Sequence, residues 1–171
     1  MRKLSVFFIA ICLLFLTACS ETTSNKSIKP ILNVEQFSLV NQAFVKEKIG
    51  EPKSIDTWNY ESPSMVKHVL TALEYDWIGY YSEFHFDDKD RLIRINIYPS
   101  DNKESQFEKT SFENYLKQLG ITPGENITKV ADTGAAWRYQ KVSEKVDEVW
   151  SLYDGNNIET IKISFDVRPF L

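Results

Sequence analysis

The chain has 171 residues and a net charge of −4 at pH 7. An acidic chain repels phosphate backbones, and no stripe of Lys and Arg alternates with aromatic residues, so the composition argues against nucleic-acid binding. With 43% hydrophobic residues, the chain is long enough for one domain with its own core.

The N-terminus has the three parts of an export signal. Two basic residues at 2–3 precede an apolar run over residues 4–15, which is too short to span a bilayer because a spanning helix needs about 20 residues. The run leads to the sequence Leu-Thr-Ala-Cys at 16–19. Cys12 lies inside the apolar run, so the exported chain would keep Cys19 alone and could form no internal disulfide.

The stretch 16–19 resembles the lipobox of bacterial lipoproteins. The resemblance implies that a signal peptide, residues 1–18, is removed and that Cys19 is acylated, palmitate being one such chain. The protein would then be exported and anchored in the outer leaflet of the cell membrane, or in the outer membrane if the host has one. Residues 19–32 would be the lipidated cysteine and a polar, flexible tether, and 33–171 a single domain. The alternatives are an uncut membrane anchor and a plain secretory signal with an unrelated cysteine.

Two helices are predicted within the domain. The first begins after Ser38 as its N-cap and ends at Gly50, since Pro52 cannot continue it. The second begins after Ser111 and ends at Gly120. Its apolar residues recur at helical spacing: Phe112, Tyr115, Leu116 and Leu119.

A hairpin pattern follows each helix. Residues 83–97 and 149–163 both alternate between apolar and polar positions around a polar turn. A Trp-x-Tyr strand stands between each helix and its hairpin, at 58–60 and 137–139. The match predicts an internal repeat, although all hairpins alternate in a similar way.

The pattern helix–strand–strand–strand, found twice, predicts an α+β fold. We expect one antiparallel sheet built from two such repeats, about 33–99 and 108–171, with both helices packed on one face. The first repeat has about 13 extra residues, which fall within 62–81. Residues 65–73 fit a strand or a helix; the strand is favoured, with a turn at 78–79. The predicted core is Leu39, Phe44, Trp58, Phe84, Phe86, Leu92, Ile95, Tyr115, Leu116, Leu119, Trp137, Trp150, Leu152, Ile161 and Ile163.

One set of residues in the first repeat carries a family resemblance: Gly50, Pro52, Trp58, Tyr60, Phe84, Phe86, Asp87 and Ile95. This order of helix, Gly-x-Pro, Trp-x-Tyr strand and hairpin resembles small barrel-assembly-type envelope lipoproteins. Its tandem form resembles the β-lactamase-inhibitor-protein fold. The second repeat departs from the pattern, because Gly120 is followed by Ile-Thr-Pro. The resemblance therefore implies a fold and carries over no functional residue.

The residues give little support for catalysis or metal binding. The chain has two histidines, and His85 alternates with two phenylalanines, which predicts a solvated residue on the sheet face away from the core. A zinc site needs three or four suitably spaced ligands, and the acidic turn at 87–90 lacks the spacing of a calcium loop. No P-loop, dinucleotide-binding or nucleophile-elbow motif occurs. We predict no catalytic residue, no metal site and no cofactor.

The stretch 76–81 places three aromatic residues around the turn predicted at 78–79. Trp and Tyr dominate binding hot spots, so Trp77, Tyr80 and Tyr81 are predicted to form an accessible binding tip, unless they cover one end of the core. The leading interpretation is a non-catalytic envelope lipoprotein that binds a partner protein through its sheet face or hairpin tips. An accessory role in envelope assembly and an inhibitor or immunity role both remain open. The rival is a lipid-anchored hydrolase or small-ligand-binding lipoprotein.

Overall fold

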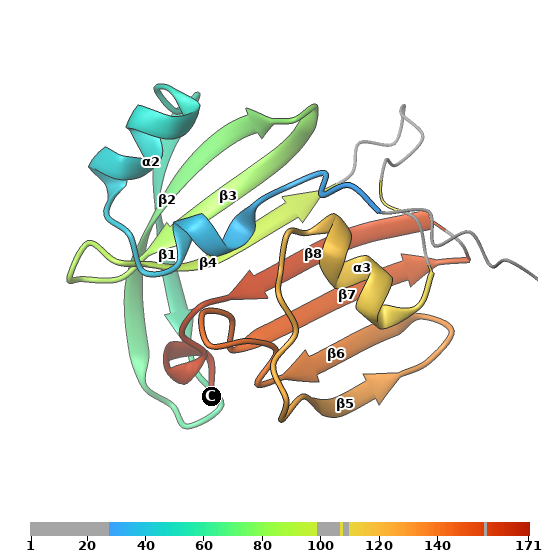
Figure 1. Ribbon diagram of the computed structural model, residues 1–171. Coiled ribbons are helices and arrows are strands. Elements are labelled where there is room, and N and C mark those ends of the chain that lie inside the picture. The colour runs from blue at the N-terminus through green and yellow to red at the C-terminus, as the bar shows by residue number, and fades with distance from the viewer. Residues whose placement is uncertain (1–27, 99–106, 108–109, 156) are drawn as a thin grey trace, which may run out of the picture.

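The computed structural model describes residues 28–98, 107, 110–155 and 157–171, so the predicted signal and Cys19 lie outside the described part. Eight strands form one antiparallel sheet in the order β1-β2-β3-β4-β8-β7-β6-β5 (Figure 1). Among the described residues, no helix is both long and apolar enough to cross a membrane. The elements are a 3₁₀ turn at Val34–Phe37, α2 Gln42–Ile49, β1 Ser54–Glu61, β2 Lys67–Trp77, β3 Tyr80–Phe86, β4 Leu92–Tyr98, α3 Phe112–Gln118, β5 Thr128–Asp132, β6 Ala136–Gln140, β7 Glu148–Asp154, β8 Asn157–Ser164 and a second 3₁₀ turn at Arg168–Phe170.

The fold is mainly β, and the predicted α+β class is wrong. The helices span only eight and seven residues, whereas the strands form a single large sheet. The predicted repeat of one helix and three strands is wrong as well, because four strands follow each helix. The stretch 62–81 contains the long strand β2, as favoured, but β5 is an edge strand that the sequence pattern did not predict.

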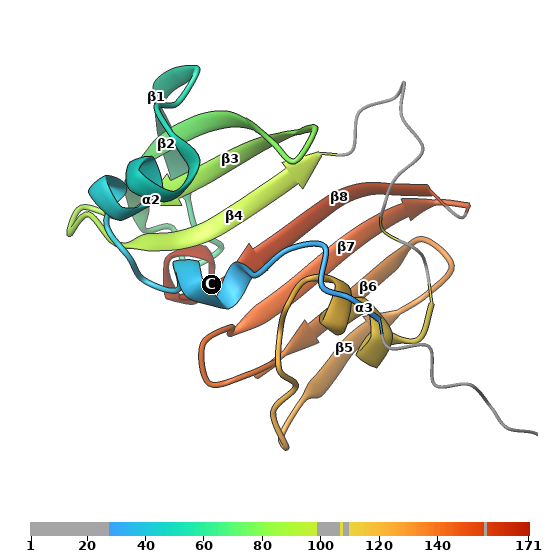
Figure 2. The same cartoon turned by 45° about the horizontal axis from the view of Figure 1, so that its top comes forward.

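The two four-stranded halves of the sheet meet where β4 pairs with β8. In that pairing Ile95 lies opposite Ile163, and Ile97 lies opposite Ile161. All four side chains are fully buried in the same apolar cluster, so the halves share one core. Figure 2 shows β4 and β8 as neighbours along the middle of the sheet.

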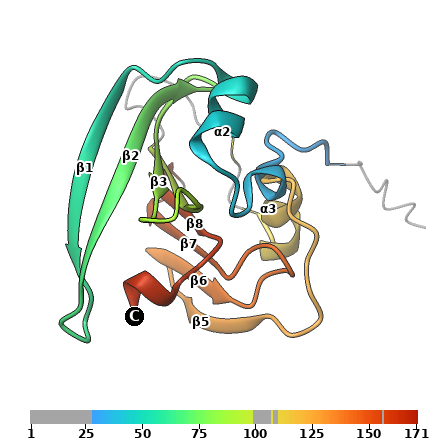
Figure 3. The same ribbon diagram turned by 90° about the vertical axis from the view of Figure 1, so that its left-hand side faces the viewer.

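One face of the sheet carries this main core and is covered by both helices (Figure 3). α2 contributes Val45, and α3 contributes Tyr115 and Leu116, all of them fully buried in the main cluster. Because burial of aromatic and branched side chains is the largest favourable contribution to folding, this face holds most of the stability of the domain. The opposite face is covered by no helix and only partly by the C-terminal 3₁₀ turn.

The two helices begin at local caps. Ser111 caps α3, as predicted, and accepts a hydrogen bond from the backbone N–H of Asn114 at 3.3 Å. The cap of α2 is Asn41 and not Ser38. The chain turns between them at Leu39, whose φ is 55°, and this turn leaves the Leu39 side chain 42% exposed, contrary to its predicted place in the core.

Gly120 ends α3 as predicted, and its environment requires glycine. Its φ is 68°, and a Cβ atom would lie 2.3 Å from the carbonyl oxygen of Leu32. The segment 31–32 packs there because the backbone N–H groups of Ile31 and Leu32 both donate to the carbonyl of Gln118, at 2.8 and 3.0 Å. Leu32 is buried, so the packed domain begins within the segment predicted as the tether.

Strand β7 has the opposite register to the predicted one. Trp150 and Leu152 were expected in the core, but Val149 and Ser151 are the residues that face the helices and are fully buried. The hydroxyl of Ser151 hydrogen-bonds that of Tyr115 at 2.8 Å. A shift of one residue moves every side chain of a strand to the other face, and this buried contact with α3 selects the observed register.

Trp58 also lies on the face away from the helices, contrary to the prediction. With Tyr60 it packs against a second, smaller cluster of Leu70, Ile93 and Phe170. The Trp-x-Tyr strand of β6 instead points its Trp137 into the main core. The two Trp-x-Tyr strands therefore occupy different positions in the fold, β1 at the edge and β6 inside the sheet.

Candidate functional site

The predicted aromatic tip does not form an accessible binding site. The turn at Ile78-Gly79 exists, with φ values of 51° and 85°. Tyr80 is only 2% exposed and packs against Phe107, so its predicted accessibility is wrong. Trp77 is half-buried against the main core.

Tyr81, the third residue of the predicted tip, points to the other face of the sheet and is 38% exposed. Its ring lies 5.6 Å from that of Tyr98, and its hydroxyl donates to the Oε1 atom of Glu83 at 3.2 Å. The alternation of β3 thus separates Tyr80 from Tyr81. The site that emerges is the sheet face to which Tyr81 belongs.

We call this face, opposite the helices, the open face. Its central part carries polar and aromatic side chains from neighbouring strands, because the strand register places them opposite one another. Glu83 of β3 lies opposite Asn96 of β4, Asn96 opposite Lys162 of β8, and Lys162 opposite Trp150 of β7. The central open face comprises Glu83, His85, Arg94, Asn96, Tyr98, Arg138, Glu148, Trp150, Lys162 and Ser164.

Glu83 is the centre of a hydrogen-bond cluster on the open face. Its Oε2 atom accepts from the Tyr98 hydroxyl at 3.0 Å and from Nδ2 of Asn96 at 3.1 Å, and it lies 3.3 Å from Nε2 of His85. These donors, the imidazole of His85 first among them, lower the pKa of Glu83 to about 2 although burial opposes ionisation. The cluster therefore holds a carboxylate in its charged form.

His85 points away from the main core as predicted, but the prediction that it is solvated is wrong. It is only 2% exposed, because the ring of Trp58 covers it at a centroid distance of 4.6 Å. Its Nδ1 atom and the Oδ1 atom of the buried Asn96 have no hydrogen-bond partner among the described residues. Most buried polar groups in proteins are paired, so two unpaired ones side by side are a feature that needs an explanation.

Arg94 is a buried cation without an ion-pair partner among the residues that the structure describes. It is 7% exposed, its Nε donates to the Ser164 hydroxyl at 2.9 Å, and its guanidinium carbon lies 3.3 Å from the centre of the Phe170 ring. Desolvation lowers the pKa of Arg94 to about 10, so the group stays charged at neutral pH. The carboxylate that most opposes this lowering of the pKa, Glu148, is held by Arg138 at 2.9 Å between Nε and Oε2.

Lys162 is a second cation beside Arg94. Desolvation, followed by repulsion from Arg94, lowers the pKa of its ammonium group. The ammonium lies 4.8 Å from the centre of the Trp150 ring, which holds the guanidinium of Arg138 at 5.0 Å. The half-buried indole therefore stands within reach of two cations on the open face.

A pocket of about 230 Å³ opens on this face between β1 and β8. Its charges are separated: the carboxylates come from β1, β2 and β3, and the two cations come from β4 and β8. His85 and Asn96, which carry the unpaired buried atoms of this face, also line it. The lining residues are Asp56, Thr57, Trp58, Ala72, Glu74, Glu83, His85, Arg94, Asn96, Tyr98 and Lys162.

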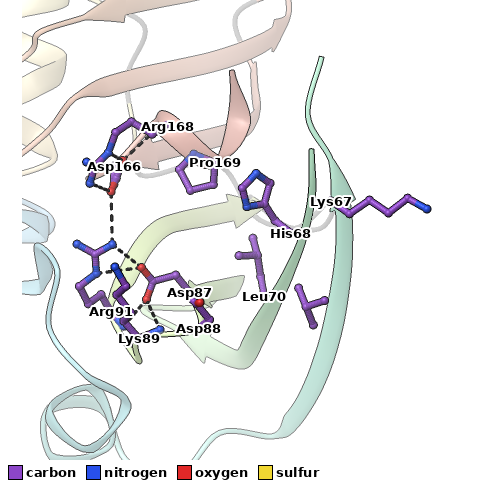
Figure 4. A pocket seen from close by; sticks show the side chains of 11 residues that line it. Lys67, His68, Leu70, Asp87, Asp88, Lys89, Arg91, Asp166, Arg168 and Pro169 are labelled. Atoms are coloured by element: carbon purple, nitrogen blue, oxygen red, sulfur yellow. Dashed lines mark hydrogen bonds and ion pairs between the residues drawn. The ribbon is translucent and has the colours of Figure 1, made fainter. Parts of the chain in front are cut away.

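A larger pocket of about 620 Å³ lies between β2, the β3–β4 turn and the C-terminal segment (Figure 4). Four of its charged groups pair with each other: Arg91 donates to Asp87 at 2.6 Å and lies 3.7 Å from Asp166, which in turn accepts from Arg168 at 2.8 Å. This chain of ion pairs ties the C-terminal segment to the β3–β4 turn. These four charged groups therefore have a structural role, whereas Arg94 in the open-face pocket has no ion-pair partner among the described residues.

The open face is suited to binding more than to nucleophilic chemistry. The His85–Glu83 contact resembles the orienting pair of a general base, but no hydroxyl or thiol of the described residues bonds to Nδ1 of His85. Among the described residues, no three His, Cys, Asp or Glu side chains gather as a metal site would require. The sequence analysis predicted a sheet face as a binding surface only in general terms. The spacing Glu-x-His and Arg-x-Asn on adjacent strands is the sequence signal that marks its polar centre.

Comparisons with protein-family models, with curated proteins and with solved structures find no match to this chain.

Proposed function

We propose that this protein is a membrane-anchored envelope lipoprotein that binds another protein through its open face. The observation that carries the proposal is the pre-formed arrangement of Arg94, Lys162 and Trp150 on a sheet face that no helix covers. Trp, Tyr and Arg are the residue types that contribute most to protein interfaces, and here their orientations are fixed by neighbours.

The difference in packing between the two faces of the sheet supports a binding role. The helix face is filled by the main core. The open face combines half-buried aromatic residues with charges that are desolvated before any partner arrives. Pre-organised groups lose little entropy on association, which favours specific binding.

Binding of a small molecule is the second candidate, and the pocket beside Arg94 is the observation that favours it. Its volume of about 230 Å³ lies below the roughly 300–1,000 Å³ typical of ligand pockets. It is large enough for one side chain or a very small acid. We therefore rank a protein partner first.

Site-specific photocrosslinking in the native envelope tests the proposal. A photoreactive residue at Trp150 should form one discrete protein adduct, identified by mass spectrometry, because this position lies at the centre of the open face. The same residue at Glu113, which is exposed on α3, serves as the control and should form no such adduct. Equal adducts from both positions, or none from Trp150, would contradict the proposal.

The anchor is tested separately through Cys19, which lies outside the described residues. Cys19→Ala should prevent acylation and processing at this position, so the chain should lose its mature, acylated mass, because the lipobox-like stretch 16–19 requires the thiol for acylation. Fractionation and intact-mass measurement check both effects. A variant that keeps its membrane association and mature mass would show that Cys19 is not the anchor.

A further inference from the structure

Arg94 presents an incomplete hydrogen-bonding pattern. Its guanidinium has five N–H donors in one plane. The Nε donor is used by Ser164 at 2.9 Å, and Phe170 holds one face of the plane at 3.3 Å. The two terminal nitrogens make no hydrogen bond or ion pair with any residue that the structure describes. A terminal pair of this kind matches the two oxygens of a carboxylate, which is the usual bidentate partner of arginine.

Lys162 is the second positively charged residue, beside Arg94, that lines the open-face pocket. It lies opposite Asn96 in the β4–β8 ladder, two ladder positions from the Arg94–Ser164 pair and therefore on the same sheet face. The ammonium also has no ion-pair partner among the described residues, and it lies 4.8 Å from the centre of the Trp150 ring. Two unpaired cations that repel each other would both be stabilised by one anion placed between them.

The unpaired atoms of His85 and Asn96 lie in the same pocket, and both accept hydrogen bonds: Asn96 presents its Oδ1 atom, and His85 presents Nδ1 because its Nε2 donates to Glu83. Both side chains are more than nine-tenths buried, and both line the pocket that Arg94 and Lys162 close on the other side. A donor such as a water must satisfy these two atoms, since a carboxylate cannot, so the anion site itself is defined by Arg94 and Lys162. Glu83, the pocket carboxylate nearest to them, is already occupied by its own donors.

We propose that Arg94 and Lys162 form a carboxylate-binding subsite, and that its occupant is an acidic side chain of the partner protein. The inference rests on the proposed protein-binding function and adds the chemistry of the contact. A single Asp or Glu side chain fits a pocket of about 230 Å³, whereas a ligand that binds by itself usually needs a larger one. The carboxylates on β1–β3 exclude a second negative group, so the subsite takes one acidic residue and not an acidic cluster.

The first arm of the test uses acetate as the probe, with the protein purified from membranes in detergent. Titration followed by NMR at the Arg94 Nε–H and the Trp150 indole N–H should give saturable shifts in the wild type. Lys162→Gln and Arg94→Gln should each weaken acetate binding at least threefold. Lys129→Gln, which removes one exposed positive charge from β5, is the matched control and should leave it within twofold. Lys162 is only half-buried, so its variant is informative even if Arg94→Gln unfolds.

The second arm uses the crosslink from Trp150. The partner segment in the adduct should contain an Asp or Glu, and changing that residue to Asn or Gln should abolish the adduct, as should Lys162→Gln. Acetate binding without any adduct would assign the subsite to a free small acid and would overturn both the partner assignment and the proposed function. An adduct without saturable acetate shifts, or one that survives these substitutions, would overturn the subsite and leave the protein-binding function standing.

Discussion

Replacing Phe84 by alanine should lower the free energy of unfolding by about 3–5 kcal/mol. The side chain is fully buried at the centre of β3. Its ring packs edge-on against Phe37, Tyr75 and Trp77 at centroid distances of 5.8, 5.3 and 5.3 Å. The substitution removes these contacts and leaves a cavity that three large rings cannot close. Because small domains are stable by only about 5–15 kcal/mol, urea unfolding followed by circular dichroism will show the change directly.

Ile55→Ala is the control for this substitution. Ile55 lies on the edge strand β1 and is 58% exposed, so its truncation should change the stability by about 0.5 kcal/mol or less. A small effect of Phe84→Ala, close to that of Ile55→Ala, would mean that the helix face is not the main core. The comparison therefore tests the assignment of the two sheet faces.

The helix-face core was predictable where local signals and alternation agree. In β3 and β4, Phe84, Phe86 and Ile95 follow a strict alternation, and all three are fully buried. The cap at Ser111 and the stop at Gly120 fix the limits of α3 in the same direct way. Each of these features depends on neighbours in the sequence, which is why the sequence alone identifies them.

The register of β7 could not be read from the sequence. Both of its faces carry apolar residues, so alternation favours the larger pair, Trp150 and Leu152. The observed register of β7 depends on a contact between Ser151 and Tyr115, which are 36 residues apart in the sequence. Trp150 is stable on the open face because two cations surround its ring. Long-range contacts of this kind override the local pattern.

The prediction of the fold class was wrong for a related reason. The strand β5 is short and its side chains are mostly exposed, so it has almost no apolar alternation to detect. Its pairing with β6 creates the edge of the sheet and makes four strands follow each helix. The polar centre of the open face was missed because polar residues on a strand normally face solvent, whereas His85 and Asn96 are buried by neighbouring side chains.

The Glu83 cluster should make stability depend strongly on pH, and Glu83→Gln should remove that dependence. The pKa of Glu83 falls from 4.5 to about 2 in the folded protein, a difference equivalent to about 3 kcal/mol of stabilisation. A lowered carboxyl pKa stabilises the fold fully above the unfolded value. The contribution is lost as the pH falls from about 4.5 through about 2. At pH 7 the wild type should therefore be the more stable protein by about 3 kcal/mol.

Urea unfolding of both proteins between pH 2 and pH 7 measures this contribution. Other carboxylates with lowered pKa, such as Asp166, are present in both proteins, so the difference between the two curves isolates Glu83. That difference should shrink as the pH is lowered and nearly vanish at pH 2, because protonated Glu83 no longer gains from its donors. Glu113→Gln, an exposed change on α3, is the control and should change the free energy of unfolding at pH 7 by about 0.5 kcal/mol or less. Parallel curves for the wild type and Glu83→Gln would mean that the contacts of Glu83 with His85, Asn96 and Tyr98 do not select the ionised form.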